Sequence, residues 1–157
     1  MSDSRISSRR TLPVVTVALV VLTGLTSLAA PEPSAHFDLL VLDREQLRAW
    51  PWLTAHFLHT DYGHLAWNLL AFACLGWLGE SHGRLRFVAA LGAGIVAVDV
   101  WFALFAHDIR FYCGLSGALN TVLLVTLYGL RGSIPSVWLI AFAAAVAAKI
   151  AWESHTG

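Results

Sequence analysis

Long apolar segments constrain this chain more than any other feature. Residues 12–30 and 112–130 carry no charged side chain, and residues 87–106 carry only Asp99. A membrane-spanning helix needs about 20 mostly apolar residues, because a helix rises about 1.5 Å per residue and the hydrocarbon core is about 30 Å thick. Two further candidates are residues 64–79 and residues 134–152. The sequence therefore predicts an all-α fold, a polytopic membrane bundle with about five transmembrane helices.

The composition agrees with a membrane environment. Of the 157 residues, 57% are hydrophobic and 13% are charged, whereas soluble domains are about 45 to 50% apolar and about 25% charged. The excess apolar surface must face lipid. The formal net charge is zero, so no basic surface favours nucleic acid as a partner.

The common cofactor motifs are missing from the sequence. It has no phosphate-binding loop, no dinucleotide fingerprint after a strand and no His-Glu-x-x-His zinc motif. Cys74 and Cys113 lack the spacing of zinc ligands or of a redox pair. We therefore expect no cofactor and no metal.

Arginines predict the orientation of the spans. Arg5, Arg9 and Arg10 place residues 1–11, a basic N-terminus, in the cytoplasm. A cleaved signal peptide is the competing interpretation, but the apolar run exceeds the usual length of about 7 to 15 residues, so an uncleaved first helix is favoured. Alternation of the spans then places residues 31–63 outside.

The outer connection, residues 31–63, has the composition of an interfacial segment. It combines Leu39, Leu40, Leu42 and Leu47 with Trp50 and Trp52, and tryptophan is enriched where membrane meets water. We expect residues 31–63 to rest on the membrane as a loop, and residues 12–157 to form one membrane domain.

Three polar residues are expected at the same depth near the outer face. His64 begins the second span, and Asn68 lies four residues later on the same helical face, about 6 Å along the axis. Ser116 lies near the outer start of the fourth span. A Gly-x-Ser-Gly motif alone most often serves helix packing. Its combination with His64 and Asn68 at one depth favours a site.

The surroundings of Ser116 suit nucleophilic catalysis. Residues 114–117 read Gly-Leu-Ser-Gly at a helix start, where unpaired backbone N–H groups and the helix dipole favour negative charge. Donors from His64 and Asn68 could complete an oxyanion hole, and such donors contribute about 3 kcal/mol each in soluble serine proteases.

These residues resemble the rhomboid family of intramembrane serine proteases. The resemblance rests on residues 56–69, which contain His59, His64 and Asn68, and on residues 114–117. The short chain, the lead-in at residues 50–54 and the end at residues 149–153 resemble more specifically the bacterial branch called rhombosortases. The resemblance covers about residues 48–157.

The resemblance implies a role for each site residue. Ser116 would be the nucleophile, His64 and Asn68 would stabilise the oxyanion, and a histidine on a sixth helix would be the general base. The chain departs from the family pattern twice: it ends at Gly157, before such a helix, and Asn120 stands where many rhomboids have an aromatic residue.

Three candidates for the base stay open. His155 follows the fifth span, and a neutral imidazole suits the task. Lys149, if desolvated, could form a Ser-Lys dyad, although its expected depth matches Asp99 and favours an intramembrane ion pair. The third possibility is that this chain is a truncated product and that the base lies beyond Gly157.

The resulting functional prediction is an intramembrane serine endopeptidase in the bacterial inner membrane. The family resemblance implies that it cuts membrane-anchored C-terminal tails of exported proteins near the outer face. The alternatives are a catalytically inactive rhomboid-like protein that binds transmembrane segments, or a truncated rhombosortase. The expected partners are protein substrates and the lipid bilayer.

Overall fold

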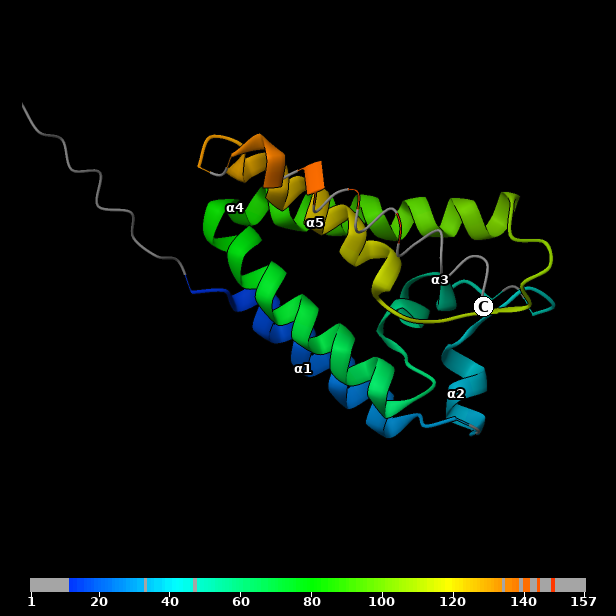
Figure 1. Cartoon of the computed structure of the whole chain (residues 1–157). Helices are drawn as coiled ribbons and strands as arrows, with labels where there is room; N and C mark the ends of the chain where they lie inside the picture. Colours follow the sequence, from blue (N-terminus) through cyan, green and yellow to red (C-terminus); the bar gives the residue numbers. More distant parts are fainter. Residues whose placement is uncertain are drawn as a thin grey trace, which may run out of the picture.

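The computed structural model is helical over most of its described length (Figure 1). It describes residues 12–133 except 33 and 47, and residues 135–138, 140, 141, 144 and 148. In chain order the elements are α1 (Val14–Ala29), α2 (Ala35–Leu40), β1 (Leu42–Asp43), α3 (Pro51–Thr54), η1 (Ala55–Phe57), α4 (Tyr62–Leu104), β2 (Phe111–Tyr112) and α5 (Ser116–Leu130). The predicted span at residues 134–152, with Lys149, and the candidate base His155 lie outside the fully described part.

Helix α4 is two helices joined at a glycine. Its 43 residues would measure about 65 Å, twice the hydrocarbon thickness. Gly83 interrupts the helical geometry with φ 155° and ψ 99°, a backbone conformation that favours glycine. The predicted spans at residues 64–79 and 87–106 fall on either side of this turn. Figure 1 shows the first half of α4 beside α1 and the second half crossing α5.

The helices expose apolar side chains that a soluble protein would bury. Among the described helices, α4 is long and apolar enough to cross a membrane, and α1 and α5 are shorter apolar helices. Large exposed side chains occur on all three, including Val17, Leu25, Trp67, Trp77 and Leu124. An apolar surface this extensive is stable in contact with lipid.

Helix α1 buries three of its four polar side chains. Thr16, Thr23 and Ser27 are buried, while most of the large apolar residues of α1 are exposed. Gly76 of α4 gives Thr16 room, since a Cβ on Gly76 would lie 2.7 Å from the Thr16 side chain. Small residues and hydroxyl groups of this kind let membrane helices approach closely.

Glu80, whose side chain is fully buried, joins α4 to the start of α1. Its carboxylate accepts hydrogen bonds from the backbone N–H groups of Val15 (3.2 Å) and Thr16 (2.9 Å), and from the Thr16 hydroxyl (3.0 Å). The Arg84 guanidinium donates to the same carboxylate at 2.7 Å. Glu80 thus satisfies backbone donors of α1 that no helical carbonyl can reach.

Replacing this carboxylate should destabilise the fold. We expect Glu80→Gln to lower the free energy of unfolding by about 2 kcal/mol, because hydrogen bonds to a charged group contribute more than neutral ones. Thermal unfolding in detergent measures the change. Ser81→Ala, an exposed position next to Glu80, is the matched control and should keep the parent melting temperature.

The connection between α1 and α4 is fastened to the segment before α5. Strand β1 pairs antiparallel with β2, with Leu42 opposite Tyr112. Arg44 of the connection donates to the carbonyls of Phe102 and Ala106 at the end of α4, and its guanidinium lies over the Phe102 ring. Leu42 and Phe102 also share a buried cluster. The described residues of this connection are therefore attached both to the end of α4 and to the segment before α5.

Helices α4 and α5 pack through small residues. A Cβ on Gly94 would lie 2.9 Å from Ala118 Cα, and a Cβ on Gly117 would lie 2.4 Å from Val98 Cγ2. The largest buried apolar cluster includes Phe87, Ala90, Leu119 and Val122 of the same two helices. The glycines bring the start of α5 directly against the second half of α4.

Helix α5 begins at Ser116, four residues after the predicted start of the fourth span at residue 112. Residues 111 and 112 form a strand instead, and Gly114 has a φ of 112°. That positive φ cannot continue a right-handed helix. Ser116 is consequently the first residue of its helix.

Candidate active site

The first two turns of α4 present the predicted histidine and asparagine. The Asp61 carboxylate caps the helix by accepting from the His64 N–H at 2.7 Å, as an N-cap aspartate does. One turn later Asn68 is buried, whereas the His64 side chain is exposed. The two residues lie on one face of α4, as their four-residue spacing predicts.

Asn68 is held by a histidine to which sequence reasoning assigned no role. Asn68 Nδ2 lies 2.8 Å from His59 Nε2, and His59 Nδ1 lies 3.4 Å from Ser27 Oγ. The Ser27 hydroxyl donates to the Phe57 carbonyl. Only one proton arrangement satisfies this chain: Asn68 donates to a bare Nε2, and Nδ1–H donates to Ser27. One Asn68 amide hydrogen remains for another acceptor.

Burial keeps His59 neutral, as that arrangement requires. Burial, together with the nearby His64, lowers the pKa of His59 from 6.5 to about 4. The unfolded chain therefore binds a proton near pH 6.5, and the folded chain does so only near pH 4. The contribution of His59 to the free energy of unfolding is therefore complete above pH 6.5 and is lost as the pH drops toward 4, by about 1.4 kcal/mol per pKa unit.

Replacing His59 should flatten this pH dependence. We expect the melting temperature of the parent chain to fall between pH 6.5 and 4 more steeply than that of His59→Gln. Glutamine does not titrate, and the carboxylates are common to both chains, so the difference isolates His59. Parallel curves for the two proteins would contradict the assigned proton arrangement.

Gly114, two residues before Ser116, is fixed at both of its backbone polar groups. Its N–H donates to the Ala55 carbonyl at 2.9 Å, and its carbonyl accepts from the Tyr112 hydroxyl at 3.0 Å. Ala55 belongs to η1 and is fully buried. The segment just before Ser116 is thereby hydrogen-bonded to the connection between α1 and α4.

Ser116 occupies an uncapped helix start. The N-cap residue, Leu115, has no side-chain acceptor for the first N–H groups of α5. These N–H groups carry the positive end of the helix dipole and form a natural binding place for an anion. A tetrahedral oxyanion formed on Ser116 would lie within their reach.

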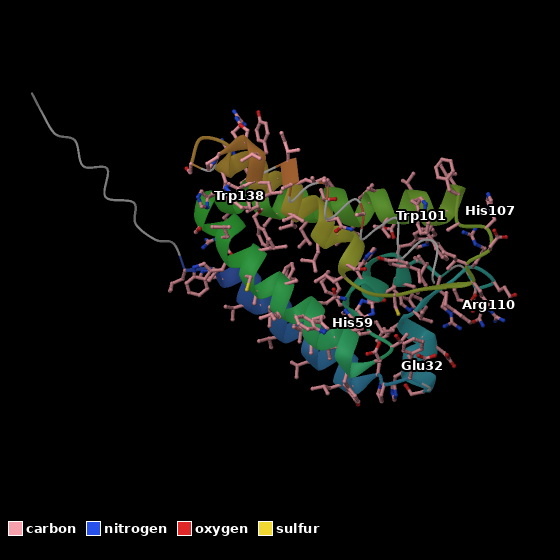
Figure 2. All side chains as sticks on the ribbon, viewed as in Figure 1. Glu32, His59, Trp101, His107, Arg110 and Trp138 are labelled. Carbon is pink, nitrogen blue, oxygen red and sulfur yellow. The ribbon has the colours of Figure 1, made fainter. Side chains whose placement is uncertain are left out.

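The structure brings His64 to the loop before Ser116. A Cβ on Gly114 would lie 3.9 Å from His64 Cε1, which is van der Waals contact distance. The His64 ring also packs edge-on against His59, with 5.4 Å between ring centroids. His64, Asn68 and the start of α5 thus gather where the loops before α4 and α5 meet, near the His59 labelled in Figure 2.

The structure does not assign the general base. His155 lies outside the described residues, and so does Lys149. Among the described residues Asp99, the expected partner of Lys149, contacts His56, with Nε2 to Oδ1 at 3.1 Å. Sequence reasoning gave His56, the first residue of the 56–69 segment, no role of its own. An acidic residue in the middle of an apolar helix was the signal that some partner exists.

Cavities and metal ligands point to no other centre in the described part of the chain. A groove of about 750 Å³ lies between the turn of α4 at Gly83 and the C-terminal half of α5, lined by residues that include His82, Arg86 and Arg131. It lies away from Ser116. No group of three metal-binding side chains occurs among the described residues.

Fold and site together define a class: a helical membrane protein with a serine at an uncapped helix start and a histidine and an amide on the neighbouring helix. A rhomboid domain model matches residues 46–156. The chain belongs to the rhomboid family, whose members are intramembrane serine proteases. Comparison with curated proteins and with solved structures finds no match.

Proposed function

We propose that this chain is a serine endopeptidase that cuts membrane-anchored segments of other proteins, with Ser116 as nucleophile. The observation that carries the proposal is the approach of His64 to Gly114 beside the uncapped start of α5. Membership of the rhomboid family supports the same reaction class.

The proposed reaction follows from these positions. The Ser116 hydroxyl attacks the scissile carbonyl, and the negative charge develops on the carbonyl oxygen. Donors are available at the α5 start, in the free amide hydrogen of Asn68 and in the imidazole of His64, where preorganised dipoles are most effective. We keep His155 as the proposed proton acceptor, because a serine needs a base to become nucleophilic.

We further propose an orientation with Ser116 near the outer face of a bacterial inner membrane. The start of α1, the turn inside α4 and the end of α5 lie at one end of the helices in Figure 1, and the start of α5 lies toward the other. Arg84, Arg86 and Arg131 belong to the first end, as the positive-inside rule expects of a cytoplasmic face. The multi-pass topology and the rhombosortase branch, with tail-anchored exported proteins as substrates, belong to this proposal.

Two measurements test the function. The chain is purified in detergent and exposed to a fluorophosphonate probe, which reacts with activated serine hydroxyls, and it is also co-expressed with a tail-anchored reporter. We expect labelling and cleavage by the parent chain, loss of both in Ser116→Ala, and retention of both in Ser81→Ala. Loss in His155→Ala would identify the base.

The opposite result is equally clear. A folded parent chain that neither labels at Ser116 nor cleaves the reporter would contradict the enzyme and favour the non-catalytic binder of transmembrane segments. Co-purification of the uncut reporter with that chain would identify such a binder.

A further inference from the structure

A buried histidine–aspartate pair lies beside the segment that carries Ser116. His56 belongs to η1 and is 0% exposed, and Asp99 lies in the second half of α4 with a side chain 18% exposed. Their contact, 3.1 Å between Nε2 and Oδ1, joins residues 43 positions apart. Removing an ionisable group this far from water is costly unless it has a partner.

The His56 ring has few other ways to be satisfied. Its Nδ1 is buried and has no hydrogen-bond partner among the described residues. The bond from Nε2 to Asp99 is therefore the ring's one polar contact in this part of the chain. Loss of Asp99 would leave both ring nitrogens buried and unpaired, so η1 would be expected to move.

Gly114 is held in place by two sets of contacts that depend on η1. Ala55, adjacent to His56, accepts from the Gly114 N–H. The His56 ring packs edge-on against Tyr112, with centroids 5.4 Å apart, and the Tyr112 hydroxyl donates to the Gly114 carbonyl. Both backbone bonds of Gly114 thus depend on groups next to His56.

We propose that His56 and Asp99 are positioning residues that hold Gly114 and, through it, the start of α5 with Ser116. Neither residue touches the nucleophile through any contact described above. Their role is to fix η1 against α4, so that Ala55 and Tyr112 hold the loop before Ser116 in one geometry. The consequence for catalysis rests on the proposed function, whereas the consequence for the loop does not.

The chain offers a probe of the loop that needs no activity. Its two cysteines are Cys74, which is exposed, and Cys113, which lies between Tyr112 and Gly114 and packs partly buried against a small apolar cluster. In a Cys74→Ser background, the rate of maleimide alkylation therefore reports how often the segment at residue 113 opens.

The alkylation experiment compares variants in that background. We expect Asp99→Ala and His56→Ala to raise the alkylation rate about tenfold each, and the double variant to raise it no further, because one interaction is lost in all three. Asp99→Asn should stay close to the parent rate, since its amide oxygen can still accept from His56. Ser81→Ala, an exposed position on α4 away from this pair, is the control and should keep the parent alkylation rate.

Fluorophosphonate labelling of Ser116 supplies the second readout. Asp99→Ala should label about a hundredfold more slowly, in line with the cost of misplacing a reacting group by about 1 Å, and Asp99→Asn should recover most of the rate. With the tail-anchored reporter, kcat should fall while KM changes little. Tyr112→Phe, which removes one hydroxyl and keeps the ring, covers the case in which an alanine variant fails to fold, and should show smaller shifts in the same directions.

Each failure has its own signature. Unchanged alkylation in Asp99→Ala, His56→Ala and Tyr112→Phe would overturn the positioning role, whatever the activity. Faster alkylation with unchanged labelling would overturn its catalytic consequence. A parent chain that never labels at Ser116 would overturn the proposed function, and the alkylation rates would still decide whether the pair holds the loop.

Discussion

Gly94→Ala is expected to lower the labelling rate of Ser116 about a hundredfold and to destabilise the fold by about 1 to 3 kcal/mol. The added Cβ would lie 2.9 Å from Ala118 Cα and 3.0 Å from the Ala118 carbonyl oxygen. Both are backbone atoms of α5, which cannot rotate away as a side chain can. Helix α5 must therefore shift, and Ser116, two residues from Ala118, must shift with it.

The same stretch of helix provides the control. Gly92 lies two residues earlier, and a Cβ there would meet nothing within 4 Å. Gly92→Ala should label at the parent rate, and it should unfold at the same or a higher temperature because alanine favours helix more than glycine does. Equal effects of the two substitutions would show that the α4–α5 contact does not set the position of Ser116.

The contact at Gly117 meets a side chain and not backbone, so a second substitution should restore labelling that Gly117→Ala loses. A Cβ on Gly117 would lie 2.4 Å from Val98 Cγ2, which is a side-chain atom. Shortening the side chain in a Gly117→Ala, Val98→Ala double variant should restore part of the labelling that Gly117→Ala loses. At Gly94 no such rescue exists, because the obstacle is backbone.

The apolar pattern of the sequence was a good guide to the helices and a poor guide to their ends. Residues 12–30 predicted α1 to within a few residues, because a helix with lipid on one side reads as a continuous apolar run. The start of α5 was misplaced because residues 112–115 are equally apolar. Instead, Tyr112 pairs with Leu42 of β1, and the chain turns at Gly114. Hydropathy cannot predict a strand partner 70 residues away.

Polar contacts between distant segments were predicted least well. The position of Asp99 in an apolar helix required a partner, and charge and depth favoured Lys149. The structure places His56 beside Asp99, from a connection that is held by η1 and by the β1–β2 pairing. Lys149 lies outside the described residues, so its pairing with Asp99 stays a prediction. Likewise, the spacing of His64 and Asn68 follows from helical periodicity, whereas the contact of Asn68 with His59 depends on how the loop before α4 folds.

Asn68→Ala tests the oxyanion assignment most directly. We expect the rate of reporter cleavage, measured as kcat, to fall about 10²- to 10³-fold with little change in KM, the pattern of a donor that acts mainly in the transition state. Asn68→Asp should lose as much, because a carboxylate of the same shape offers no N–H and repels the developing charge.

A loss of stability must be separated from this loss of catalysis. Alanine at position 68 leaves His59 Nε2 without its donor, which costs about 1 to 3 kcal/mol, so rates must be compared well below each melting temperature. Thr23→Val is the matched control: it replaces another buried polar group with an apolar one, and Thr23 Oγ1 has no partner among the described residues. Its kcat should stay at the parent value. If Asn68→Ala did the same, the remaining amide hydrogen of Asn68 would play no part in the reaction, and its bond to His59 would be structural only.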